Sequence, residues 1–265
     1  MTEAERRVAL EAIATEVRSC TRCRLHQTRT RAVPGEGHPS TEVVFVGEGP
    51  GQNEDRQGRP FVGRAGDLLV KMLETIGWRR DEVFITNVVK CRPPDNRDPE
   101  PDEVAACAPY LHRQLEVLDP ALVVTLGRHS LGRFMPGARI SQVHGTNRPI
   151  DPATGARAAL GYALYHPAAA LRSTEVERQS FEDVLHIPEA LLAARARRES
   201  EAALPGAEGE LSPADRAPED PLQLAETAEP TLDRPIDEPA DITVRTSAQP
   251  PMDAAAPALD QMTAF

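Results

Sequence analysis

Several features are scarce in this sequence. Aromatic residues make up 4% of the 265 positions, only four residues are cysteine, and the formal net charge is −11, so no general excess of positive charge is present. No apolar run approaches the roughly 20 residues that a membrane-spanning helix needs, and residues 1–17 are charged and periodic, without a signal-peptide core. We therefore expect a cytoplasmic protein of one or two domains with no membrane segment and no disulfide framework.

The net negative charge belongs to the last part of the chain. Residues 201–265 contain 14 of the 41 acidic and 3 of the 30 basic residues, which leaves 27 of each in residues 1–200. The same segment has 10 of the 25 prolines and one aromatic residue, Phe265. Because so little apolar surface cannot offset the entropy lost on ordering, we predict a disordered acidic tail (201–265) on a domain formed by residues 1–200.

Apolar spacing in the first 200 residues predicts helices that alternate with strands. Helical periodicity is found at 3–19, 65–77, 102–118 and 176–197, the last bent at Pro188. Buried strands are expected in TEVVFVGEGPG, at 83–90 and at 121–127, and two or more edge strands within 139–165. This order is typical of an α/β fold with a mostly parallel sheet covered by helices on both faces.

In such sheets, ligands bind beyond the carboxyl ends of the strands. The segments that follow the predicted strands at this edge are GEGPG, with Glu48 in the turn, then Asn87, and finally His166 before Pro167. Each also has a plain structural interpretation: Glu48 as a solvated turn residue, Asn87 as a buried amide bonded within the protein, and His166 as a helix-start residue. Phe61, taken alone, would be assigned to the core.

The four cysteines all lie near the ends of predicted elements. Cys20 and Cys23 form a C-x-x-C pair after the first helix, Cys91 follows the second strand, and Cys107 faces inward from the next helix. A redox pair and buried thiols are the simpler alternatives, but four cysteines in one domain favour a single four-thiolate site for zinc or an iron–sulfur cluster. The 15 residues between the second pair are unlike a zinc ribbon and favour a cluster.

Three stretches together resemble one known family. They are VVFVGEGPGQNEDRQGRPFVGRAG, ITNVVKCRPPDNRDPEPDE and YHPAAALR, combined with the cysteine spacing. Over roughly residues 15–195 the chain is similar to the thermophile-type, family 4 uracil-DNA glycosylases. The resemblance implies a three-layer α/β/α sandwich, a [4Fe–4S] cluster on the four cysteines, and hydrolysis of the N-glycosidic bond of uracil in DNA after the nucleotide is flipped out of the stack.

The same resemblance implies roles for the residues of the pocket. Phe61 would stack on the flipped base, and Asn87 would read its N3–H and O4 edge. Glu54 would crowd the C5 position and reject thymine. Glu48 would position or activate the attacking water, while neutral His166 would donate to O2 of the departing uracil anion. The backbone of Gly49 and Pro50 would line the pocket.

Contact with DNA must come from local charge, since residues 1–200 are neutral overall. Lys90, Arg92, Arg97 and Arg172 are expected near the pocket, and Leu171 could wedge into the vacated stack. Each arginine is also compatible with a solvated surface position. At the other end of the chain, Gln261 and Phe265 loosely resemble a sliding-clamp peptide, whereas the simpler interpretation of the tail is a solubilising extension.

We expect a monomer that acts on uracil-containing DNA. Two other functions remain as alternatives: a DNA-lesion or single-strand binding protein without catalysis, and a zinc-stabilised α/β hydrolase of another substrate. The sequence contains no G-x-S-x-G motif, which counts against the hydrolase.

Overall fold

The computed structural model describes residues 1–156 and 158–203. Within them, six strands form one sheet in the order β1-β3-β2-β4-β6-β5. The strands are β1 (Glu36–Gly37), β2 (Val43–Gly47), β3 (Phe84–Asn87), β4 (Leu122–Leu126), β5 (Asn147–Pro149) and β6 (Leu160–Leu164). The four central strands run parallel, and the edge strands β1 and β5 are antiparallel to their neighbours.

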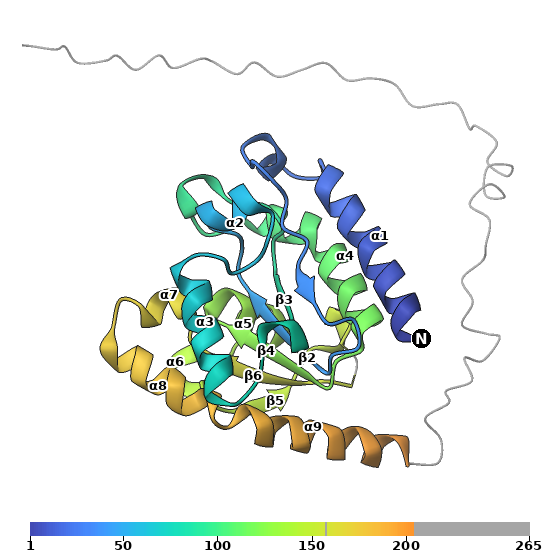
Figure 1. Ribbon diagram of the computed structural model, residues 1–265, viewed down its shortest axis with the longest axis vertical. Coiled ribbons are helices and arrows are strands. Elements are labelled where there is room, and N and C mark those ends of the chain that lie inside the picture. Colours follow the sequence, from blue (N-terminus) through green and yellow to red (C-terminus); the bar gives the residue numbers. More distant parts are fainter. Residues whose placement is uncertain (157, 204–265) are drawn as a thin grey trace, which may run out of the picture. The chain divides into compact units, whose positions relative to one another are not determined.

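Helices cover both faces of the sheet, as Figure 1 shows. The longer ones are α1 (Glu3–Ser19), α3 (Arg64–Thr75), α4 (Pro101–Leu118), α8 (Thr174–Val184) and α9 (Ile187–Ala202). The shorter ones are α2 (Gln52–Gln57), α5 (Arg128–Phe134), α6 (Ile140–Val143) and α7 (Pro167–Ala170). The 3₁₀ turns are η1 (Arg24–Gln27), η2 (Arg80–Glu82), η3 (Pro94–Asn96) and η4 (Pro152–Thr154).

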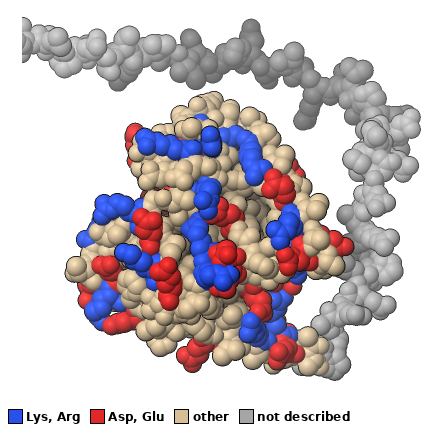
Figure 2. All heavy atoms as spheres, in the orientation of Figure 1, with Lys and Arg blue, Asp and Glu red and all other residues tan. Residues whose placement is uncertain are grey.

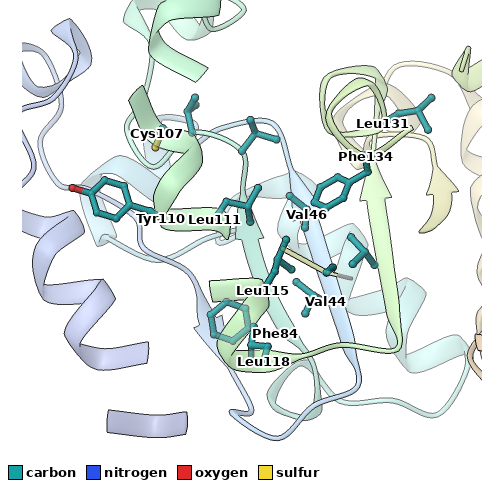
Figure 3. Packing of buried hydrophobic residues seen from close by; sticks show 14 of the residues in the cluster. Val44, Val46, Phe84, Cys107, Tyr110, Leu111, Leu115, Leu118, Leu131 and Phe134 are labelled. Carbon is teal, nitrogen blue, oxygen red and sulfur yellow. The ribbon is translucent and has the colours of Figure 1, made fainter. Parts of the chain in front are cut away.

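Alternate side chains of each central strand enter two separate cores. Val44 and Val46 of β2 pack with the apolar sides of α1 and α4, whereas Phe45 packs with α3 and α9. In Figure 3, Leu111 and Leu115 of α4 point toward the β2 valines. Both faces are therefore buried, and the predicted three-layer α/β/α sandwich with a mostly parallel sheet is confirmed.

Local signals in the sequence explain where the two helices of the first core begin. The Thr2 side chain accepts a hydrogen bond from the Glu5 amide, and the Glu5 carboxylate accepts one from the Thr2 amide, so a capping box starts α1. Pro101 occupies the first turn of α4, where no amide donor is needed. The predicted ranges 3–19 and 102–118 agree with α1 and α4 to within one residue.

Three sequence-based expectations about the elements were wrong in detail. The strand predicted at 83–90 ends at Asn87, and the chain bends over residues 88–91 while the amides of Val88 and Val89 still bond to the carbonyls of Gly47 and Glu48. The range predicted to hold edge strands includes β6, which lies inside the sheet between β4 and β5. The final helix is two helices, with Pro188 in the first turn of α9 instead of at a bend.

No helix of residues 1–156 and 158–203 is long and apolar enough to cross a membrane. Of the predicted tail (201–265), Glu201 and Ala202 are the last residues of α9, and residues 204–265, including Gln261 and Phe265, lie outside the described residues. Its disorder and its boundary with the domain therefore stay predictions.

Candidate active site and four-cysteine site

A cavity of about 620 Å³ opens at the carboxyl ends of the four parallel strands. Each strand contributes the residues that directly follow it or end it: Glu48 after β2, Asn87 of β3, His129 after β4 and His166 after β6. All the residues predicted for a uracil pocket line this one cavity: Glu48, Gly49, Pro50, Glu54, Phe61, Asn87 and His166. The size is typical of ligand pockets, and the position is the one expected for a parallel sheet.

Asn87 is buried at the floor of this cavity with an unused hydrogen-bond acceptor. Its side chain is 1% exposed, and Oδ1 has no hydrogen-bond partner in the structure. A Cβ atom at Gly47 would lie 2.4 Å from that oxygen and 2.7 Å from Cζ of Phe61, so glycine is required at the end of β2 for the amide and the ring to approach. A buried acceptor without a donor is costly, and it points to a ligand that donates.

Phe61 is held in an unusual backbone conformation beside this amide. Its φ is 49°, in the left-handed region that non-glycine residues rarely occupy. Arg80 donates to the Phe61 carbonyl oxygen at 3.0 Å, and Glu54 Oε1 accepts from the amides of Val62 and Gly63, both at 2.9 Å. These bonds hold the segment from both sides, so the ring is fixed at the pocket wall.

His166 presents one defined nitrogen to the cavity. Its Nδ1 accepts a hydrogen bond from the Ala168 amide at 3.1 Å, so the neutral ring carries its proton on Nε2. Burial, assisted by the positive charge of Arg172, lowers the pKa of His166 to about 4. The ring therefore stays neutral near pH 7, and its centroid lies 5.8 Å from that of Phe61.

Glu48 lies among charged groups in the same cavity. Burial raises the pKa of Glu48 above its ordinary value, and Asp98 adds to this effect, while His129 and Arg128 oppose it. His129 Nε2 lies 3.7 Å from Glu48 Oε2. A carboxylate with a raised pKa is a better proton acceptor than one in open water.

The four cysteines come together at a second place, on the α1–α4 side of the sheet. Cys20, Cys23, Cys91 and Cys107 line one small cavity and form no disulfide with one another. Donors surround the sulfurs: the Arg29 guanidinium bonds Cys91 Sγ at 3.0 Å, and the Lys90 amide bonds Cys107 Sγ at 3.2 Å. Burial raises the pKa of the Cys107 thiol to about 11 and also raises those of Cys23 and Cys91.

These thiols fit a bound metal group better than a set of free core cysteines. Buried thiols with raised pKa values lose their protons when a cation provides compensating charge. Among the described residues, only Glu48, Asp98 and His129 form a group of three or more potential ligands whose atoms lie within 4.8 Å of one another. The sulfurs are thus spread more widely than the about 3.8 Å separations of a tetrahedral zinc site with 2.3 Å bonds.

Comparison with known proteins agrees with this geometry. Residues 34–187 match the model of the uracil DNA glycosylase superfamily. The chain belongs to the uracil-DNA glycosylase superfamily.

Three curated relatives of this uracil-DNA glycosylase family member are type-4 enzymes. The type-4 uracil-DNA glycosylase of Sulfurisphaera tokodaii is 49% identical over 187 residues, 68% of this chain and 84% of the relative. That of Saccharolobus solfataricus is 46% identical over 188 residues, with 69% and 86% covered. That of Thermotoga maritima is 46% identical over 177 residues, with 66% and 91% covered. The resemblance to family 4 is confirmed.

Among the predicted DNA-contacting residues of this glycosylase, Lys90 was assigned wrongly. Its side chain is 1% exposed, and Nζ donates to Thr86 Oγ1, the Asn87 carbonyl oxygen and Gln114 Oε1 at 2.6, 2.9 and 2.7 Å. An ammonium held in this way cannot reach a phosphate. The lysine follows a strand that ends three residues earlier than expected, so the chain has already turned inward.

The remaining predicted contacts lie at or near the pocket. Arg97 and Arg172 line the cavity, and Leu171 is 36% exposed on the same segment as Arg172. Arg92 is bonded to Asn96 at 2.8 Å, and Arg97 is paired with buried Glu103 at 2.6 Å. On the face shown in Figure 2, basic and acidic side chains are interspersed. Contact of these residues with DNA stays a prediction.

Sequence reasoning missed His129, Asp98 and Arg128, which line the cavity beside Glu48. The signal was present, because Arg128 and His129 directly follow the predicted strand 121–127 at the edge already singled out. Asp98 gave no such signal, since the proline-rich loop that carries it has no periodicity.

Proposed function

We propose that this protein hydrolyses the N-glycosidic bond of uracil in DNA, releasing uracil and leaving an abasic site. The observation that carries this proposal is the buried, unpartnered Oδ1 of Asn87 beside the fixed ring of Phe61. A flat base with a ring N–H would supply the missing donor and stack on the ring. Uracil has this donor at N3, whereas the corresponding atom of cytosine is an acceptor.

His166 would stabilise the leaving group. Breaking the bond between C1′ and N1 leaves negative charge on uracil, shared with O2. The neutral ring carries its proton on Nε2, since Nδ1 already accepts from Ala168. Because His166 is uncharged near pH 7, it donates to the anion without first protonating the base. A preorganised donor of this kind lowers the barrier by about 3 kcal/mol.

Glu48 would act on the attacking water. Its carboxylate lines the same cavity as Phe61 and His166, and burial favours its taking up a proton. Water that attacks C1′ loses a proton to this carboxylate as the new C–O bond forms. Glu54 is proposed to exclude a C5 methyl group; its bonds to the Val62 and Gly63 amides show that it also shapes the pocket loop. The backbone of Gly49 and Pro50 would complete the pocket.

Cys20, Cys23, Cys91 and Cys107 are proposed to hold a [4Fe–4S] cluster. The support is the set of four thiols, the donors from Arg29 and Lys90, and the wide separation of the sulfurs. When bound, the cluster would supply a structural cross-link among the end of α1, the loop after β3, and α4. The chain's own residues carry the reaction at the separate cavity.

We further propose that four residues contact DNA: Arg92, Arg97, Leu171 and Arg172. The protein is also proposed to act as a monomer in the cytoplasm. Gln261 and Phe265 are proposed to bind the sliding clamp. Deleting 261–265 should abolish clamp pull-down and leave excision from oligonucleotides intact; equal pull-down with the shortened protein would end that proposal.

An oligonucleotide assay tests the proposed reaction. The purified full-length protein is incubated with single- and double-stranded oligonucleotides that carry uracil, hypoxanthine or a thymine mismatch, followed by alkali. Cleavage only at uracil supports the proposal. Binding without cleavage would favour the lesion-binding alternative, and no action on any substrate would reject both.

A further inference from the structure

His129 is placed where it can act through Glu48. It is the second residue of α5, directly beyond the carboxyl end of β4, and it lines the same cavity. Its Nε2 lies 3.7 Å from Glu48 Oε2 and 3.3 Å from Asp98 Oδ1. The side chain is 28% exposed, as is that of Glu48, whereas Asp98 is 57% exposed. The three residues therefore form a short path from the cavity wall toward solvent.

His129 also contacts its neighbour on α5. The Nε of Arg128 donates to His129 Nε2 at 2.9 Å, so in this arrangement the guanidinium takes up the lone pair of that nitrogen. Arg128 also pairs with Asp98 at 2.6 Å, which holds both groups in place. The Arg128 side chain is 69% exposed, so its bond to His129 can be exchanged for one from Glu48.

The charged and titratable groups around Glu48 come from three segments. Asp98 lies on the loop between β3 and α4, Arg128 and His129 on α5, and His166 at the start of α7. Asp98 repels a negative charge on Glu48, while Arg128 and His129 favour it. His166 has its proton on the nitrogen that faces the cavity and its other nitrogen bonded to Ala168, so it has no lone pair to offer Glu48. This leaves His129 as the imidazole next to Glu48 that can exchange a proton with it.

Attack of water on C1′ transfers a proton to Glu48. We propose that His129 Nε2, once Arg128 releases it, accepts a proton from Glu48 in the same step and then gives it to solvent beside Asp98. The water molecule forms its bond to C1′ and gives a proton to Glu48; the C1′–N1 electron pair leaves with uracil; the Glu48 proton passes to His129, and the imidazolium loses it to bulk water. The uracil anion later takes a proton from solvent, so charge and atoms balance.

This role rests on the proposed function of Glu48, and its test separates the two. Single-turnover excision is measured for the wild type, His129→Ala, His129→Gln and Glu48→Gln, between pH 5 and 9 as a rough range around the histidine pKa. His186→Gln, a change at an exposed histidine between α8 and α9, is the matched control. Added imidazole serves as a replacement proton acceptor.

A proton acceptor behind the main base should account for less than the usual 10²–10⁴-fold acid–base contribution, about 10- to 100-fold. We expect His129→Ala and His129→Gln to lose that much rate, with His129→Ala recovering as neutral imidazole is added. Glu48→Gln should lose more and show no recovery, and His186→Gln should match the wild type. Wild-type rates in mixtures of H₂O and D₂O should depend nonlinearly on deuterium content, because two protons move.

Other outcomes would overturn the inference while leaving the proposed function in place. These are full wild-type activity in His129→Gln, equal loss in both variants with no recovery by imidazole, or a linear dependence on deuterium in the wild type. The last measurement needs no variant, so it decides the matter even if a substitution prevents folding. An inactive wild type would instead reject the proposed function itself.

Discussion

The buried ammonium of Lys90 donates a hydrogen bond to the backbone carbonyl oxygen of Asn87 at 2.9 Å. The backbone amide of the same lysine donates to Cys107 Sγ. One residue thus connects the amide at the floor of the pocket with the four-cysteine site. The pocket lies at the carboxyl ends of the strands and the cysteines lie on the α1–α4 side of the sheet, so the two bonds of Lys90 connect these places.

Replacing Lys90 with Met should weaken both stability and substrate binding. The change leaves the buried acceptors of Thr86, Asn87 and Gln114 without their shared donor, which should lower the free energy of unfolding by about 3 kcal/mol. Chemical denaturation measures the loss, and KM for a uracil oligonucleotide should rise. Lys71, exposed on α3, is the only other lysine, and Lys71→Met should change neither quantity. Equal stability of the two variants would contradict a structural role for the buried ammonium.

Asn87→Ala should separate activity from stability. Loss of the base-reading amide should lower kcat/KM for uracil by about 10- to 100-fold, equivalent to 1–3 kcal/mol. The melting temperature should not fall in proportion, because the substitution also removes a buried acceptor that has no partner in the free protein. Asn147→Ala, on the exposed edge strand β5, is the control. A variant that unfolds at lower temperature but excises uracil at the wild-type rate would argue that the amide is structural.

The lowered pKa of His166 predicts that the protein loses stability in acid. Its pKa is about 4 in the folded protein, below its ordinary value of 6.5, so the unfolded chain binds a proton first as the pH falls. The contribution of the neutral ring is complete above about pH 6.5 and is lost toward pH 4, by up to about 3 kcal/mol. His166→Asn keeps a side-chain acceptor for the Ala168 amide but does not titrate. Denaturation at several pH values gives the free energy of unfolding. As the pH is lowered, this free energy should fall less steeply for His166→Asn than for the wild type and for the variant of the exposed histidine, His186→Asn.

Removing one cysteine tests the cluster. We expect Cys107→Ala to lose iron, lose the brown absorbance of an iron–sulfur protein and melt at a lower temperature, because the cross-link from α4 is broken. Metal analysis of the purified protein measures its iron content, and visible spectra measure the absorbance of the cluster. Zinc in the wild type without visible absorbance would contradict the cluster, as would a variant with unchanged spectrum and melting point.

The sequence by itself determined the layered fold. Its continuous apolar runs specify strands buried on both faces, and the helical periods of α1, α3 and α4 specify the layers that cover them. It also placed Glu48, Asn87 and His166 at one edge, because parallel strands bring their carboxyl ends together. These features follow from local pattern and from the one geometric rule that all such sheets share.

Only the tertiary structure decided which groups surround each of these side chains. The strand before Lys90 ends early and buries a charge that the sequence assigned to DNA, while Asp98 reaches His129 from a loop without any periodic signal. Whether a polar group is satisfied, buried or free depends on atoms that are distant along the chain. Asn87 shows this most directly: its type and position are set by sequence, but its unused oxygen exists only because Gly47 and Phe61 close around it.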